Sequence, residues 1–199
     1  MAKGTRSWAT SSQTGARYPP RVPPVPITVL FVCTANICRS AYAEVTGRHM
    51  LGSRTDVAFS SAGTRGHASE PLNAEMAEFL PEGVAHDGFA SRRVTRDLVD
   101  RADLVLTAEA SHRTFLLEEY PHAFRKVLTL GQFAEAAAGS EQRGRELITA
   151  VGLRQPPARP EQDVQDPYRR GRAANARSAA QIDELLTIVV PALVDETTR

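Results

Sequence analysis

The sequence contains very little cysteine and lysine: only Cys33 and Cys38, and only Lys3 and Lys126, occur in its 199 residues. One close pair of cysteines cannot form the disulfide framework typical of small secreted proteins. No second pair of ligands at zinc spacing accompanies them, so we expect no metal and no cofactor. These absences favour a reducing compartment, and the cytoplasm is the expected location.

Long apolar runs are also missing. No stretch approaches the roughly 20 apolar residues that cross a bilayer, and the N-terminus lacks the apolar segment and cleavage site of a signal peptide. The 24 basic residues nearly balance the 23 acidic ones, which argues against a nucleic-acid-binding surface. We therefore expect neither a membrane nor a nucleic acid among the partners.

The length suits one domain, and its hydrophobic content of 42% is enough for a sizeable core. Residues 1–25 are rich in Ser, Thr, Gly, Pro and Arg and show no apolar period, which predicts a disordered N-terminal tail. Residues 26–199 are then expected to form the single folded domain.

Short apolar stretches alternate with helical patterns after the tail. Strands are expected at 27–32, 56–60, 103–106 and 126–130. Helices are expected at 39–51, 72–80, 108–120, 141–151 and 181–193, with Pro191 at the end or a kink of the last one, and a mobile loop over the rest of 134–162. This alternation implies crossover connections. The predicted fold class is α/β: a single small doubly wound domain with a four-stranded parallel sheet flanked by helices.

A loop with an unusual composition joins the first expected strand to the first expected helix. It starts at Cys33 and continues through Thr34, Ala35, Asn36, Ile37, Cys38, Arg39 and Ser40. The N-terminus of a helix offers free N–H groups and the positive end of the helix dipole to an anion. We therefore expect residues 34–40 to bind phosphate.

Cys33 and Arg39 are the reactive candidates in this loop. The thiolate is the nucleophilic form of cysteine, and a helix N-terminus near an arginine favours it. The planar guanidinium of Arg39 can grip two phosphate oxygens, and Ser40 is placed to donate a hydrogen bond to the thiolate. Asn36 tolerates left-handed backbone and is suited to the curl of the loop. The alternative is a buried, inert cysteine beside a solvated arginine.

The segment Asp166-Pro167-Tyr168 supplies a candidate proton donor. Proline biases the preceding residue toward extended backbone, which suits a loop that projects the carboxyl group of Asp166. The alternative is an ordinary Asp-Pro turn.

At these residues the sequence resembles the low-molecular-weight protein tyrosine phosphatases. The resemblance rests on Cys33, Asn36, Cys38, Arg39 and Ser40 and on Asp166-Pro167-Tyr168, and it extends from about Ile27 to the C-terminal helix. It implies a phosphotyrosine protein phosphatase that hydrolyses aryl phosphomonoesters through a phosphocysteine intermediate. A phosphotyrosine-containing protein or a small aryl phosphate is then the substrate, and inorganic phosphate is a product.

The resemblance also implies roles for individual residues. Cys33, Arg39 and Asp166 are the catalytic set, in which Asp166 protonates the phenolate and later takes a proton from the attacking water. His67 and Tyr168 are the candidate walls beside the substrate ring; the alternatives are a solvated loop histidine and a partly buried loop tyrosine. The family suggests that Cys38 protects Cys33 by forming a disulfide with it, and the alternative is a packed free thiol. Two positions depart from the family pattern: Ala35 replaces a usual glycine and Ala41 a usual proline. A positive φ at Ala35 would strain the loop.

Two other functions fit parts of the pattern. One is arsenate reduction on the same scaffold with a small-molecule thiol, because the chain has no further cysteine to resolve a disulfide. The other is a non-catalytic phosphotyrosine-binding module. The remaining titratable groups on polar stretches are expected to be solvated: His86, His112, His122 and the pair Glu118-Glu119.

Overall fold

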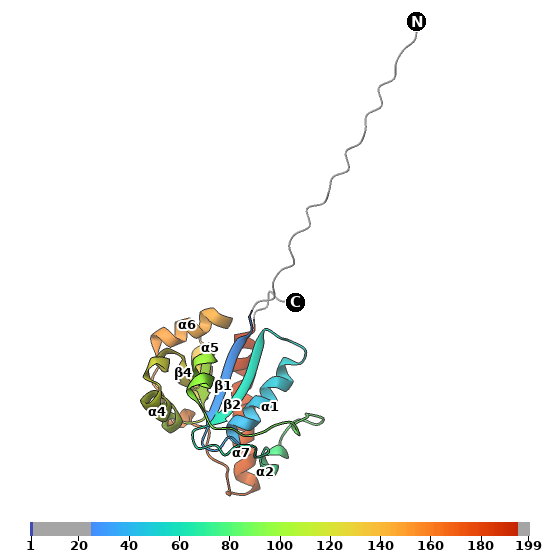
Figure 1. Cartoon of the computed structure of the whole chain (residues 1–199), viewed down its shortest axis with the longest axis vertical. Helices are drawn as coiled ribbons and strands as arrows, with labels where there is room; N and C mark the ends of the chain where they lie inside the picture. The colour runs from blue at the N-terminus through green and yellow to red at the C-terminus, as the bar shows by residue number, and fades with distance from the viewer. Residues whose placement is uncertain (2–24, 195–199) are drawn as a thin grey trace.

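The computed structural model describes Met1 and residues 25–194 (Figure 1). The predicted disordered tail, residues 1–25, lies outside this part of the chain except for Met1 and Val25. The boundary of the folded domain therefore stays a prediction.

Four parallel strands form one sheet in the order β2-β1-β3-β4, which confirms the predicted fold class. The strands are β1 (Ile27–Cys33), β2 (Val57–Gly63), β3 (Leu104–Thr107) and β4 (Val127–Thr129). The helices are α1 (Arg39–Leu51), α2 (Ala74–Ala77), α3 (Arg96–Arg101), α4 (Ala110–Glu119), α5 (Leu130–Ala138), α6 (Gly144–Arg154) and α7 (Arg172–Leu193), with 3-10 turns η1 (Pro121–Lys126) and η2 (Pro160–Gln162).

Helices cover both faces of the sheet, as a doubly wound domain requires. Val29 and Phe31 of β1 pack with apolar side chains of α1, α5, α6 and α7. Leu30 and Val32, on the opposite face of the same strand, pack with apolar side chains of α3 and α4. Because β1 is buried on both sides, its sequence is a continuous apolar run instead of an alternating one.

The predicted helix over 72–80 is wrong in length. The structure has only α2 there, and the Asn73 side chain caps it by accepting from the Met76 amide. Leu72 and Met76 are buried as the spacing suggested, but Pro81 disfavours helical backbone at the residue before it. The buried residues in this segment therefore belong to one short helix and the turns beside it, not to one face of a continuous helix.

The second half of the chain is more helical than predicted. In the interval 134–162, the helix expected at 141–151 is present as α6, which begins and ends three residues later, and most of α5 occupies part of the expected mobile loop. The start of α5 carries a capping box between Thr129 and Gln132, a local signal that the prediction overlooked. The last helix begins at Arg172, not Gln181, and continues past Pro191 to Leu193. Helix α3 was not predicted.

The strand order fixes where a ligand can bind. The chain leaves β1 to form β2 on one side, while β3 pairs with the other side of β1. The loops after β1 and β3 therefore leave the sheet in opposite directions and open a crevice at the carboxyl ends of these strands.

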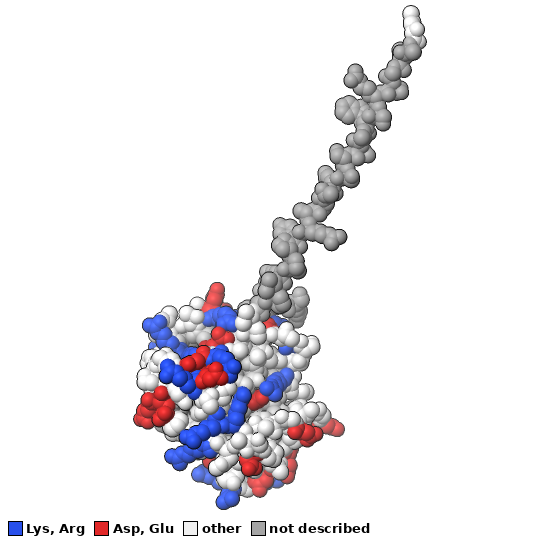
Figure 2. Space-filling model, viewed as in Figure 1, with Lys and Arg blue, Asp and Glu red and all other residues white. Residues whose placement is uncertain are grey.

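Figure 2 shows basic and acidic side chains interspersed on the face that it presents. Within residues 25–194, no helix has both the length and the apolar character needed to traverse a bilayer.

Candidate active site

The loop after β1 is held in a tight curl by Asn36. This residue is fully buried and has a φ of 60°, in the left-handed region. Its side-chain amide donates to the hydroxyls of Ser40 (3.0 Å) and Ser61 (2.7 Å), while its carbonyl oxygen accepts from the Arg92 amide at 2.9 Å. Ala35 is not among the residues with positive φ, so alanine fits there without the conditional strain considered above.

The end of β2 supports the curl from behind. The backbone amides of Thr64 and Arg65 donate to the carbonyl oxygens of Cys33 (2.9 Å) and Thr34 (2.8 Å). A Cβ on Gly63 would lie 2.6 Å from the Thr34 carbonyl oxygen. Only glycine lets the loop and the strand approach so closely at this position.

Cys33 is the last residue of β1 and is 2% exposed. Its Sγ lies 3.0 Å from the Ser40 Oγ, which confirms the expected proximity of these side chains. The second thiol differs, because burial, followed by the charge of Cys33, raises the pKa of Cys38 to about 12. Both cysteines are free thiols in the structure, so the protective disulfide remains a prediction.

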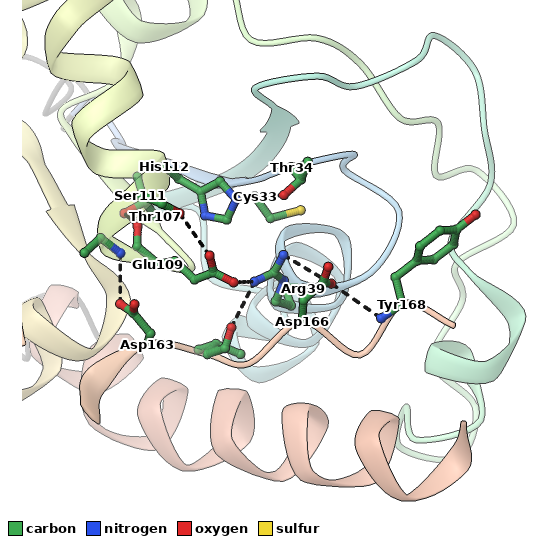
Figure 3. Close-up of polar contacts among 12 residues, drawn as sticks. Cys33, Thr34, Arg39, Thr107, Glu109, Ser111, His112, Asp163, Asp166 and Tyr168 are labelled. Atoms are coloured by element: carbon green, nitrogen blue, oxygen red, sulfur yellow. Dashed lines mark hydrogen bonds and ion pairs between the residues drawn. The ribbon is translucent and has the colours of Figure 1, made fainter. Parts of the chain in front are cut away.

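Arg39 begins α1 and its side chain is 3% exposed. It forms an ion pair with Glu109, donates to the Val164 carbonyl oxygen at 3.0 Å, and lies 3.2 Å from the Asp166 carboxylate (Figure 3). Its Nε is buried and has no partner among the described residues. The guanidinium is thus held in one orientation, and its Nε–H is left for a further acceptor.

Glu109 was not predicted as part of the site. It follows β3 and comes from the opposite side of the crevice. Burial alone would raise its pKa, but the Arg39 charge and hydrogen bond outweigh burial and lower it. Glu109 therefore stays ionised as a counterion for Arg39.

His112 was expected to be solvated, and that expectation is wrong. The residue lies in the first turn of α4 and is 5% exposed. Its Nε2 is 2.9 Å from the Thr34 Oγ1. Burial and then the Arg39 charge lower its pKa to about 4, against the opposing charges of Glu109 and Asp166. His112 is therefore a neutral imidazole beside the loop at ordinary pH. His122, by contrast, is exposed as expected.

The segment before α7 brings Asp166 to the site. Val164 is fully buried and its amide donates to the Ala108 carbonyl oxygen at 2.8 Å. The Asp163 carboxylate accepts from the Ala110 amide at 2.8 Å, at the start of α4. These contacts fix the segment just before Asp166, whose side chain remains 40% exposed.

A cavity of about 260 Å³ collects most of the predicted residues. Its lining consists of Cys33, Thr34, Ala35, Ile37, Cys38, Arg39, Arg65, His67, Asp166 and Tyr168. Two predicted residues of the loop, Asn36 and Ser40, do not line the cavity and instead form buried hydrogen bonds. Ser61 and Glu44 extend that buried network, with a 2.5 Å hydrogen bond between them.

The residues that sequence reasoning missed, Glu109 and His112, had one usable signal. They lie three and six residues beyond the strand expected at 103–106, and polar residues that follow parallel strands gather at the same edge of the sheet. Within the described residues, no group of three or more His, Cys, Asp or Glu side chains could hold a metal ion.

Fold and site together define a class: small doubly wound α/β domains whose first strand ends in a cysteine loop that leads directly into a helix. The comparisons with known proteins agree. The family model described as low molecular weight phosphotyrosine protein phosphatase matches residues 28–144. The chain belongs to this family, and it is a phosphatase, a hydrolase of phosphate esters.

Individual relatives show how far the similarity reaches. The low molecular weight protein-tyrosine-phosphatase Etp of Escherichia coli (strain K12) is 33% identical over 109 residues, which cover 54% of this chain and 72% of the relative. The structure of a low molecular weight protein tyrosine phosphatase from T. tengcongensis superposes with a TM-score of 0.64 at 26% identity, covering 83% of this chain and 98% of that one. The YwlE arginine phosphatase from Geobacillus stearothermophilus gives a TM-score of 0.67, covering 84% and 93%, and at 22% identity it shows the fold alone.

Proposed function

We propose that the chain dephosphorylates phosphotyrosine in proteins, or small aryl phosphates, with Cys33 as nucleophile, Arg39 as phosphate-holding cation and Asp166 as proton donor. The observation that carries this proposal is the single cavity lined by all three side chains. Each of the three comes from a different segment: the end of β1, the start of α1 and the loop before α7.

The first step forms a bond from the Cys33 sulfur to phosphorus and breaks the bond from phosphorus to the aryl oxygen. The leaving phenolate has a conjugate acid with a pKa of about 10, so a proton from Asp166 lowers the cost of expelling it. The two carboxylates beside Arg39 hold its guanidinium in place before substrate binds.

The second step hydrolyses the phosphocysteine. Asp166, now a carboxylate, takes a proton from water while the water oxygen bonds to phosphorus and the bond from sulfur to phosphorus breaks. The products are inorganic phosphate and the Cys33 thiolate, which the Ser40 hydroxyl is placed to stabilise at 3.0 Å. A free thiolate needs a reducing compartment, and we place the protein in the cytoplasm for this reason.

The walls of the cavity favour an aryl substrate. Ile37 contributes an apolar side chain to the lining, and Tyr168 and His67 contribute aromatic rings. A flat aromatic ring can pack on such groups. The guanidinium of a phosphorylated arginine is positively charged, and among the residues that line the cavity only Asp166 offers it a carboxylate. Phosphotyrosine is therefore expected to be turned over faster than phosphoarginine, measured as kcat/KM for the two free phosphoamino acids.

Replacing Asp166 by alanine tests the acid role. Turnover of phenyl phosphate is expected to fall by about 10²–10⁴-fold, because the phenolate must then leave unprotonated. A nitro-substituted phenyl phosphate, whose phenol is acidic, should lose far less. Steady-state kcat for both esters measures the contrast, and Asp97→Ala, at an exposed carboxylate of α3, is the matched control. Equal losses for both esters would refute the assignment.

Arsenate reduction is the alternative activity, and it is tested by measuring arsenate turnover beside aryl phosphate turnover. Arsenate contains no phenolate to protonate, so an Asp166 that lines the cavity favours the phosphatase reaction. Glutathione-dependent arsenate turnover that exceeds aryl phosphate turnover would reverse this choice. Tight phosphate binding by the wild type without any turnover would indicate the binding module.

The mouth of the cavity suggests a preference for acidic peptides. Arg65 lines the cavity, the Arg169 guanidinium lies 5.1 Å from the centre of the Tyr168 ring, and Arg170 follows in sequence. All three arginines are exposed, and none forms an ion pair with a described carboxylate. Phosphotyrosyl peptides flanked by Asp or Glu should show a kcat/KM about tenfold above lysine-flanked ones at low salt.

Salt and substitution separate this effect from local packing. The preference should shrink in about 0.5 M NaCl because salt screens exposed charges, and it should also shrink in Arg169→Gln/Arg170→Gln. Arg125→Gln is the matched control, since Arg125 is exposed in η1 at the amino end of the sheet. A preference that persists in the double variant would contradict the role of these arginines.

A further inference from the structure

His112 and Thr34 meet across the crevice between β1 and β3. Thr34 directly follows β1, and His112 lies two residues into α4, just after β3. The two strands are parallel neighbours, so their carboxyl ends bring these residues together. The resulting contact between the His112 Nε2 and the Thr34 Oγ1 measures 2.9 Å (Figure 3).

The surroundings of the imidazole decide which atom donates in this contact. The other ring nitrogen, Nδ1, is buried and has no hydrogen-bond partner among the described residues. A buried N–H without an acceptor is rarer in proteins than an acceptor without a donor. The single proton of the neutral ring therefore belongs on Nε2, which donates to the Thr34 hydroxyl oxygen.

This assignment leaves the Thr34 hydroxyl with a proton to donate. The hydroxyl has one hydrogen-bond contact among the described residues, with His112, and in that contact the hydroxyl oxygen is the acceptor. Its own proton therefore has no acceptor among these residues. Thr34 lines the same cavity as Cys33, Arg39 and Asp166. An acceptor held above the Cys33 sulfur, such as a phosphoryl oxygen, is the partner that the cavity offers.

We propose that the Thr34 hydroxyl donates a hydrogen bond to the phosphoryl group and that His112 is the positioning residue that orients this hydroxyl. The proposal rests on the phosphatase activity inferred above, and it adds a side-chain donor to the backbone amides of the loop. The hydroxyl and Arg39 would then contact the phosphoryl group from different sides. A neutral His112 suits this role because a charged ring would lie close to Arg39.

The experiment compares Thr34→Val, Thr34→Ser, His112→Phe and the double variant Thr34→Val/His112→Phe in the full-length chain. The readouts are kcat and KM for p-nitrophenyl phosphate and the inhibition constant of inorganic phosphate. Thr34→Val is expected to lower kcat/KM and to weaken phosphate inhibition, each by about tenfold, as suits one lost hydrogen bond to a charged group. Thr34→Ser keeps the hydroxyl and should stay within about twofold of the wild type.

The double variant distinguishes positioning from an independent role. If His112 acts through Thr34, His112→Phe should lower activity in the wild type by up to about tenfold but have little further effect in Thr34→Val. If the losses in kcat/KM of the two single variants multiplied in the double variant, the positioning role would be overturned. A Thr34→Val variant with unchanged phosphate inhibition would overturn the contact between Thr34 and the phosphoryl group. Thr114→Val, an exposed hydroxyl on the same helix α4, is the matched control.

Two further measurements keep the outcome interpretable. His112→Gln retains an amide N–H donor, so it replaces His112→Phe if the melting temperature shows that the phenylalanine variant does not fold. Phosphate binding to Cys33→Ser, with and without Thr34→Val, is measured by calorimetry without any turnover. A wild type that lacks phosphatase activity would sink the proposed function, while the calorimetric comparison would still test the Thr34 contact.

Discussion

Replacing Cys33 by serine is expected to lower kcat for p-nitrophenyl phosphate by about 10⁴-fold or more, while inorganic phosphate still binds. The sulfur forms the bond to phosphorus in the proposed mechanism, and a serine hydroxyl is a far weaker nucleophile than a thiolate. Loss of a nucleophile in other covalent enzymes costs up to about 10⁶-fold. Serine is close to isosteric, so the loop and the Ser40 contact should survive. Burst kinetics measure the turnover, and calorimetry measures phosphate affinity.

Cys38→Ser is the matched control, because Cys38 belongs to the same loop and is equally buried. The pKa of its thiol is raised to about 12, so almost none of it is thiolate at neutral pH. Its replacement should cost no more than about tenfold through loop packing. If Cys38→Ser were the inactive variant and Cys33→Ser the active one, the assignment of the nucleophile would be reversed.

Replacing Arg39 by lysine has the second largest expected effect, a loss of about 10³-fold in kcat/KM. An arginine that stabilises a transferring phosphoryl group contributes about 10³–10⁵-fold in other enzymes. Lysine keeps the charge but loses the planar fork and the fixed orientation that Glu109 and Val164 give the guanidinium. Because much of the lost stabilisation arises in the transition state, kcat should fall more than the affinity for inorganic phosphate.

Arg159→Lys provides the comparison for Arg39→Lys. Arg159 also pairs with a carboxylate, Glu135, but its side chain is 52% exposed and lies outside the cavity lining. Its replacement should leave kcat/KM within about twofold of the wild type, because exposed ion pairs contribute little. Melting temperatures of both variants show whether loss of activity reflects unfolding. An Arg39→Lys variant that folds and keeps full activity would rule out the proposed role of the guanidinium.

Local patterns predicted the fold class well and element lengths less well. The apolar run before Cys33 identified β1 because a strand buried on both faces must be apolar throughout. The start of α7 at Arg172 was missed because its first turns are short of large apolar side chains, with Ala173, Ala174 and Ala176 in place of a periodic apolar face. Helices of this kind are stabilised by tertiary packing, which a local pattern does not contain.

The residues of the site also divide into those that local sequence patterns predicted and those that tertiary packing brings together. The sequence by itself determined the cysteine loop, since Cys33, Asn36 and Arg39 lie within seven consecutive residues and their spacing implies their geometry. It also marked Asp166 through the proline that follows. Only the tertiary structure decided that Glu109 would pair with Arg39 and that His112 would contact Thr34. These partners are separated by at least 70 residues, and they meet because β3 pairs with β1 in the sheet, a choice made by long-range packing and not by any local signal.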